Sequence, residues 1–97
     1  MTILRARVPT ANASRYLQQL CKHWSHKFSV EFDPTHGVIH LPGTDCILDA
    51  EQEALALELR ASDPDALPRM SGVVADHLKR FAFREDLAIE WTPIPQP

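Results

Sequence analysis

Apolar residues recur every three or four positions between Ser14 and Lys27, and this spacing predicts an amphipathic helix over that stretch. The apolar stripe is formed by Leu17, Leu20, Cys21, Trp24 and Phe28. The opposite face is polar and basic, with Arg15, Gln19, Lys22, His23 and His26. We expect the hydroxyl of Tyr16, at the edge of the stripe, to lie near solvent. Thr10 or Asn12 can cap the start of this helix, and His26 and Lys27 fall in its last turn.

Alternation of apolar and polar residues indicates the strands. It predicts strands over residues 4–8, 28–33, 38–41, 46–50, 55–61 and 87–91, with turns at Asp33–Gly37 and Pro42–Thr44. The stretch 51–61 contains a conflict, because its Glu, Gln, Ala and Leu composition favours a helix. Leu55, Leu57 and Leu59 would point all round a helix but would line one face of a strand. We therefore predict a strand there.

A second apolar stripe at helical spacing follows Asp65, which can serve as its N-cap. The stripe consists of Ala66, Leu67, Met70, Val73, Val74, Leu78 and Phe81. Pro68 falls in the first turn, where its missing N–H costs little. The charged run Arg84–Asp86 ends the pattern, so the second helix is expected to stop before it.

The predicted order of elements is β-α-β-β-β-β-α-β. Four successive strands with short turns are expected to pair antiparallel, which gives a mainly antiparallel sheet. The two helices would cover one face of this sheet, so the fold class is an α+β two-layer sandwich. A single domain is expected over 1–92, with a flexible proline-rich tail over 93–97. The open sheet face would carry Arg5, Arg7, Glu31, His40, Glu58 and Arg60. Ile3, Val38 and Ile47 fall on the same face, where a contiguous apolar patch would indicate a homodimer or a protein partner.

Composition narrows the class of protein. The 97 residues carry a net charge of −3, whereas a general nucleic-acid binder would be basic, so no nucleic-acid partner is expected. No apolar run approaches the roughly 20 residues of a membrane span, so no membrane association is expected. The first residues carry no signal-peptide pattern, which predicts a cytoplasmic protein with both cysteines as free thiols.

His77 lies near the middle of the second apolar stripe, where a polar residue is unusual. A buried imidazole needs a hydrogen-bond partner, and the simplest interpretation is a core histidine bonded to a backbone carbonyl or to Tyr16. Cys21 and Cys46 should point into the same layer, so the other interpretation is a Cys–His site that forms a reactive thiolate or binds a soft metal ion. Apart from that metal ion, no cofactor is expected.

Basic residues form the candidate surface for a ligand or a partner. Arg15, Lys22, His23 and His26 lie on the polar face of the first helix, and such a stripe can receive an anion or an acidic partner. A metal site there is disfavoured, because Cys21 points toward the core and a tetrahedral site needs about four converging ligands. Arg80 and Arg84 can hold a carboxylate or phosphate. The simpler interpretation is that Arg84 and Glu85 pin the end of the second helix to the sheet.

Four parts of the sequence resemble one known family, namely Ala13–Leu17, Leu20–Lys27, Cys46 and His77–Glu85. Over nearly the whole chain, the sequence is similar to the small bacterial proteins known as domain of unknown function 2218. The resemblance implies a role in iron handling, because similar domains occur alone or joined to siderophore-interacting, flavin-dependent ferric reductases. The family also resembles, in strand and helix order, the two-layer C-terminal domain of phosphohexomutases. That likeness implies the fold and transfers no catalytic residue.

Together these features favour an uncharacterised binding or accessory module without enzymatic activity, linked to iron or siderophore metabolism. The reasons are the lack of a catalytic motif, the small size and the company that similar domains keep. The alternative is a metal- or thiol-based site that uses Cys21, Cys46 and His77. An enzyme with a small ligand between helices and sheet ranks last, because no acid–base pair can be named.

Overall fold

The computed structural model describes residues 2–94, and it contains six strands and two helices in the predicted order. The strands are β1 (Thr2–Pro9), β2 (Ser29–Phe32), β3 (His36–Leu41), β4 (Thr44–Ala50), β5 (Ala54–Ala61) and β6 (Thr92–Ile94), and the helices are α1 (Ala13–Trp24) and α2 (Ala66–Phe81). The first five strands and both helices lie where the hydrophobic pattern predicts them, with ends displaced by a few residues.

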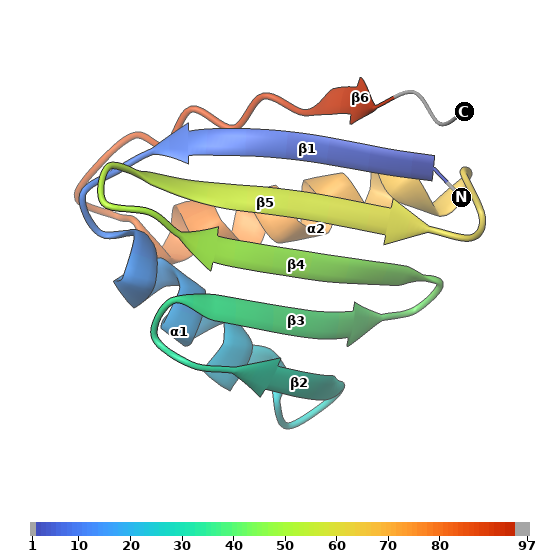
Figure 1. Cartoon of the computed structure of the whole chain (residues 1–97), viewed down its shortest axis with the longest axis horizontal. Coiled ribbons are helices and arrows are strands. Elements are labelled where there is room, and N and C mark those ends of the chain that lie inside the picture. Colours follow the sequence, from blue (N-terminus) through green and yellow to red (C-terminus); the bar gives the residue numbers. More distant parts are fainter. Residues whose placement is uncertain (1, 95–97) are drawn as a thin grey trace.

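The sheet is antiparallel throughout, in the order β2-β3-β4-β5-β1-β6. β1 comes first in the chain but lies between β5 and β6, so the first and the last strand pair with each other. Figure 1 shows both helices behind one face, with α1 behind β2 and β3 and α2 behind β4 and β5. The predicted two-layer α+β sandwich is therefore confirmed. Neither helix of the described residues is long and apolar enough to cross a membrane.

β5 resolves the conflict between composition and pattern in favour of the strand. It pairs with β4 on one edge and with β1 on the other, so both edges of its backbone are hydrogen-bonded. Leu55, Leu57 and Leu59 point under the helices and are at most 2% exposed. Burying three leucine side chains contributes several kcal/mol, at about 1.5–3 kcal/mol each. The helix preference of the segment amounts to tenths of a kcal/mol per residue, so the strand wins.

The predicted strand over 87–91 is wrong, because the last strand is β6 at Thr92–Ile94. Leu87 is buried and Ile89 and Trp91 pack against the core, so their alternation reflects burial on one side without pairing to a neighbouring strand. Pro93 lacks an N–H, and it is accommodated because β6 is an edge strand opposite β1. Pro93 and Ile94 therefore belong to a strand instead of the expected flexible tail, and the rest of that tail lies outside the described residues.

The first helix ends three residues earlier than predicted. The N–H groups of Lys27 and Phe28 both bond the carbonyl of Trp24, at 3.0 and 2.8 Å, which closes a turn after the helix. His26 and Lys27 thus lie in this turn and not in the last helical turn. At the start of α1, the Asn12 side chain forms no capping bond, whereas the Thr10 hydroxyl accepts a hydrogen bond from the backbone N–H of Asn12 at 3.0 Å.

The open face of the sheet carries a ladder of arginine–glutamate ion pairs and histidine–aspartate hydrogen bonds. Arg5 pairs with Glu58 at 2.6 Å, and Arg60 pairs with the same carboxylate. On β3 and β4, His36 bonds Asp49 and His40 bonds Asp45, at 2.6 and 2.8 Å. Val38 and Ile47 are cross-strand partners and form one apolar group on this face. Ile3 and Ile94 are partners on β1 and β6 and form another, and Arg60 lies opposite Ile3 on its other side. Charged residues therefore separate the two apolar groups. This mixture of charges is typical of a solvated face.

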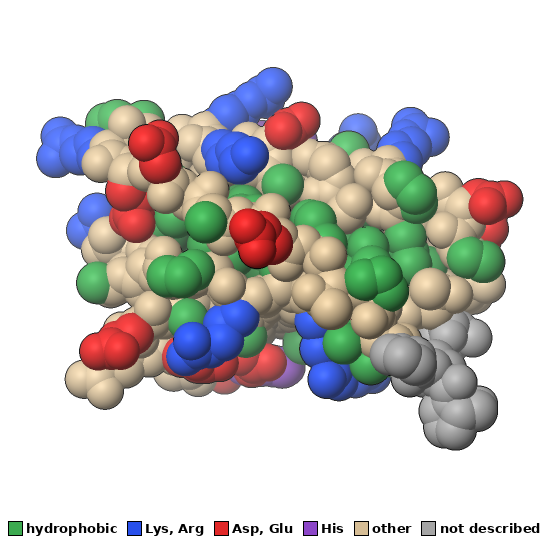
Figure 2. Space-filling view, turned by 90° about the horizontal axis from the view of Figure 1, so that it is seen from above, with side chains coloured by type: hydrophobic (Ala, Val, Ile, Leu, Met, Phe, Trp, Pro, Cys, Tyr) green, Lys and Arg blue, Asp and Glu red, His purple; other side chains and the backbone are tan. Residues whose placement is uncertain are grey.

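Hydrophobic side chains also reach the surface outside the open face. Viewed from the β6 edge, hydrophobic side chains remain visible between the charged ones (Figure 2). Two large ones are exposed among residues 2–94, namely Phe32 at 38% and Phe83 at 79%. Phe32 lies on the edge strand β2, whereas Phe83 follows α2 and borders a hollow described next.

Candidate functional site

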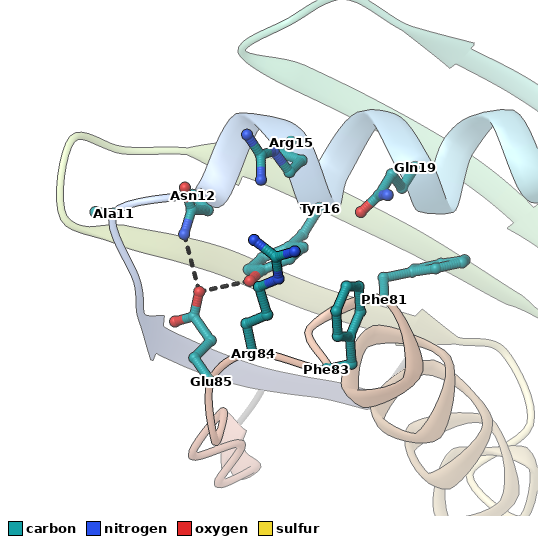
Figure 3. A pocket seen from close by; sticks show the side chains of 9 residues that line it. All are labelled: Ala11, Asn12, Arg15, Tyr16, Gln19, Phe81, Phe83, Arg84 and Glu85. Carbon is teal, nitrogen blue, oxygen red and sulfur yellow. Dashed lines mark hydrogen bonds between the residues drawn. The ribbon is translucent and has the colours of Figure 1, made fainter.

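A hollow of about 630 Å³ lies between the start of α1 and the segment that follows α2 (Figure 3). We call it the arginine hollow. It is lined by Ala11, Asn12, Arg15, Tyr16, Gln19, Phe81, Phe83, Arg84 and Glu85. Its volume falls within the range of roughly 300–1,000 Å³ that small-molecule sites occupy. Residues far apart in the chain therefore meet in one place of suitable size.

Glu85 joins the two walls of the arginine hollow. Its Oε2 atom accepts hydrogen bonds from the Tyr16 hydroxyl at 2.5 Å and from Asn12 Nδ2 at 2.9 Å (Figure 3). These two bonds lower the pKa of Glu85, so the carboxylate stays ionised near neutral pH. The pKa of Tyr16 is raised, first by burial and then by its bond to Glu85. The Tyr16 side chain is thus buried, while its hydroxyl lies at the lining of the hollow and donates to Glu85. Glu85 pins the end of α2 to α1 instead of to the sheet.

Two guanidinium groups provide the positive charge of the arginine hollow. Figure 3 shows the Arg84 side chain reaching from the segment after α2 toward Tyr16, and Arg15 lines the same hollow from α1. Neither arginine forms an ion pair with a carboxylate within residues 2–94. The Phe83 ring lies 5.3 Å from the Arg84 guanidinium carbon, a cation–π distance. The arrangement combines anion-binding groups with an exposed aromatic surface.

A second hollow, of about 490 Å³, lies between the end of α1, the β3–β4 turn and α2. We call it the imidazole hollow. It is lined by His23, Trp24, Lys27, Phe28, Leu41, Pro42, Arg69, Met70, Val73 and His77. His77 is half-buried, and its Nδ1–H donates to the Val73 carbonyl at 2.7 Å. The partner is thus the backbone carbonyl that the first interpretation named, and Tyr16 bonds Glu85 instead.

The two thiols lie apart from the surface in the core layer. Cys21 and Cys46 are both fully buried. Burial raises the pKa of Cys21 to about 11 and raises the pKa of Cys46 strongly, with a smaller contribution from Cys21. The ring contacts of His77 are with His23 and Trp24. Within residues 2–94, no three His, Cys, Asp or Glu side chains gather as a metal-binding group, so Cys21, Cys46 and His77 do not form one.

The structure divides the predicted basic surface between different places. Arg15 joins Arg84 at the arginine hollow, and His23 joins His77 at the imidazole hollow. The other predicted residues, Lys22, His26 and Arg80, are exposed and line neither hollow.

Sequence reasoning missed several residues that complete these hollows. They are Asn12, Tyr16, Gln19, Phe83 and Glu85 at one, and Trp24, Lys27 and Arg69 at the other. One signal was present for Phe83, because this aromatic residue falls outside the helical stripe that ends at Phe81. The pairing of Glu85 with Tyr16 left no signal, since it depends on the path of the chain after α2.

Comparison with known proteins identifies relatives of similar sequence and fold. The sequence profile of DUF2218, described as an uncharacterized protein conserved in bacteria, matches residues 5–92. A solved NMR structure, that of PA4090 from Pseudomonas aeruginosa, is 42% identical in sequence and has a TM-score of 0.80. The similarity covers 95% of this chain and 96% of that one. A comparison with curated proteins finds no match.

Proposed function

The chain belongs to the bacterial DUF2218 family, and from that premise we propose that it is a non-enzymatic binding or accessory module in iron or siderophore metabolism. Its ligand would be a small anionic molecule with an aromatic ring, bound in the arginine hollow. The observation that carries the proposal is the pair Arg15 and Arg84 beside the exposed ring of Phe83.

The electrostatics of the arginine hollow support an anionic ligand. Two like charges that share a hollow repel each other, and an anion between them relieves this repulsion. Guanidinium groups bind carboxylates and other planar oxyanions through paired hydrogen bonds. The carboxylate of Glu85 also lines the hollow, but it already accepts from Tyr16 and Asn12, so two guanidinium groups face one engaged carboxylate. The net charge of the whole chain is −3, so this local excess of positive charge is not a property of the whole surface.

The aromatic part of the ligand is argued from Phe83. A phenyl ring that is 79% exposed costs free energy in water unless something covers it. A ligand ring can stack on Phe83 while its anionic oxygens reach Arg84, which already lies over that ring. Catecholates combine a flat ring with adjacent anionic oxygens, and they are iron-binding groups of siderophores. This chemistry agrees with the iron handling that the family resemblance implies.

A binding role suits Glu85 better than a catalytic one. Its carboxylate accepts from both Tyr16 and Asn12, and its lowered pKa makes it a poor proton donor or acceptor near neutral pH. Tyr16, with its raised pKa, holds its proton. We therefore assign this pair the task of holding the walls of the hollow together.

The proposal is tested by calorimetric titration with 2,3-dihydroxybenzoate and with its ferric complex. Arg15→Gln and Arg84→Gln should each weaken binding by about tenfold, because each removes one charged hydrogen-bonding group worth about 1.4 kcal/mol. Lys22→Gln is the matched control, since it removes an exposed charge of the same helix outside the hollow. Equal affinity in all three variants, or no binding to the wild-type protein, would refute the proposal. Binding of the free acid but not of the ferric complex would remove only the link to iron.

A further inference from the structure

We infer that the imidazole hollow is a second binding site, which takes a flat aromatic carboxylate with a ring hydroxyl or N–H group. This inference is independent of the arginine hollow, because the two share no lining residue. It is carried by three observations on the described residues: the sign of the charges, the shape of the aromatic walls and the hydrogen bonding of His77.

The charges around the imidazole hollow are all of one sign. Lys27 and Arg69 line it, and no aspartate or glutamate does. Neither cation forms an ion pair with an acidic side chain within residues 2–94. The whole chain has 13 acidic residues against 10 lysines and arginines, so a hollow without any acid is an exception on this surface. A carboxylate is the complementary group.

The walls of the hollow favour a flat ring. The Trp24 ring centroid lies 4.9 Å from that of His77 and 6.1 Å from that of Phe28, so these rings pack against one another and form one continuous aromatic wall on which a flat ring can lie. His23 adds a further ring 5.3 Å from His77. The remaining lining includes the apolar side chains Leu41, Met70 and Val73. Aromatic walls with an apolar floor and a few polar groups are what small-molecule sites provide.

His77 adds a hydrogen-bond acceptor. A carbonyl oxygen can only accept, so the Nδ1 atom that bonds Val73 carries the proton. In the neutral ring, Nε2 then bears a lone pair, and no residue of the described chain is hydrogen-bonded to it. A ring hydroxyl or N–H of the ligand can donate to Nε2 while its carboxylate meets Lys27 or Arg69. The recognition therefore requires both groups on the same flat molecule.

The test uses 6-hydroxy-2-naphthoate as the probe in a Trp91→Phe protein. The chain has two tryptophans, so this variant leaves Trp24 as the single indole, and its N–H signal in a ¹H–¹⁵N NMR spectrum reports on the hollow. We expect a saturable shift of that signal. Two analogues, 2-naphthoate without the hydroxyl and 2-naphthol without the carboxylate, should each bind about tenfold more weakly.

Matched variants locate the two recognition groups. Arg69→Gln should weaken 6-hydroxy-2-naphthoate by about tenfold, whereas Arg80→Gln, an exposed residue of the same helix outside the hollow, should not change it. His77→Phe, which keeps a flat ring but has no hydrogen-bond acceptor, should abolish the preference for the hydroxylated probe over 2-naphthoate. Arg84→Gln should have no effect, which separates this site from the arginine hollow. Arg69 and Arg80 are both exposed, so neither substitution removes a buried side chain. A Trp24 signal that does not move, or equal binding to the Arg69 and Arg80 variants, would overturn the inference.

Discussion

At the scale of single residues, burial decides which candidate groups are chemically available. Cys21 and Cys46 are conspicuous ligand and nucleophile types in the sequence, yet both lie in the core with no exposed surface. Arg15 and Arg84 looked less specific, yet both reach a hollow. The residue types could be identified from the sequence, but their surroundings could not, because the depth of a side chain depends on how the two layers pack.

The thiols should be slow to react in the folded protein. The pKa of Cys21 rises from an ordinary 9.0 to about 11, so its thiolate fraction at neutral pH falls by about a hundredfold. Iodoacetamide should therefore modify the native protein at least about a hundredfold more slowly than a free model thiol, and burial slows it further. Mass spectrometry follows the rate, and protein unfolded in urea is the control, which should label quickly. Labelling of native Cys21 at the rate of a free thiol would revive the Cys–His interpretation.

Glu85→Gln should destabilise the protein by about 1–2 kcal/mol at pH 7, because it removes the charge from two hydrogen bonds. The folded pKa of Glu85 is depressed, so its stabilisation is present above the ordinary pKa of 4.5 and is lost as the pH falls through the lower folded value. The difference in unfolding free energy between wild type and variant should accordingly shrink between pH 7 and pH 3. Urea denaturation at the two pH values measures this. If the difference in unfolding free energy between wild type and Glu85→Gln stays constant with pH, the charge of Glu85 contributes nothing to stability.

At the scale of elements, the same alternating pattern succeeds at β5 and fails at residues 87–91. In β5, both edges find partners, so the alternation of Leu55, Leu57 and Leu59 reflects a true strand. In 87–91, the side chains Leu87, Ile89 and Trp91 pack on the core, but the backbone forms no ladder until Thr92. Periodicity reports which side chains are buried, whereas pairing depends on a neighbour with free hydrogen-bonding groups. The sequence pattern therefore predicts faces better than it predicts strand ends.

Close packing of α1 on β3 can be tested at Gly37. A Cβ atom there would lie 2.8 Å from the Sγ atom of Cys21 and 3.2 Å from the Cβ of Phe32. Gly37→Ala should therefore lower the free energy of unfolding by about 1–3 kcal/mol, as overpacking in cores does. Thermal and urea denaturation measure the change.

Gly72→Ala is the control with the opposite sign. Gly72 is exposed within α2 and an added Cβ meets no atom within 4 Å, so alanine should stabilise the helix by about 0.5–1 kcal/mol.

Cys21→Ala should partly rescue the stability of Gly37→Ala, because it removes the sulfur atom that lies too close to the added Cβ. If Gly37→Ala proves as stable as the wild type, the close contact between α1 and β3 is not as described.

At the scale of the whole molecule, the distribution of charge separates the two faces. On the open face of the sheet, opposite charges neutralise one another, as in the pairing of Glu58 with Arg5 and Arg60. In the helical layer, Arg15, Arg84 and the cations of the imidazole hollow have no acidic partner among the described residues. The fold class could be predicted from periodicity alone. The meeting of Arg15 with Arg84 could not, because it depends on how the segment after α2 returns to α1.

The most direct test of the account is to locate a ferric ligand on the surface of the protein by NMR. Fe³⁺ is paramagnetic and broadens nearby signals, so the ferric complex of 2,3-dihydroxybenzoate can be compared with its diamagnetic gallium complex. The account predicts broadening centred on the Gln19 side-chain amide, Phe83 and Arg84 around the arginine hollow, and sharp signals from His40 on the open face of the sheet. Broadening centred elsewhere, or no broadening at all, would contradict it.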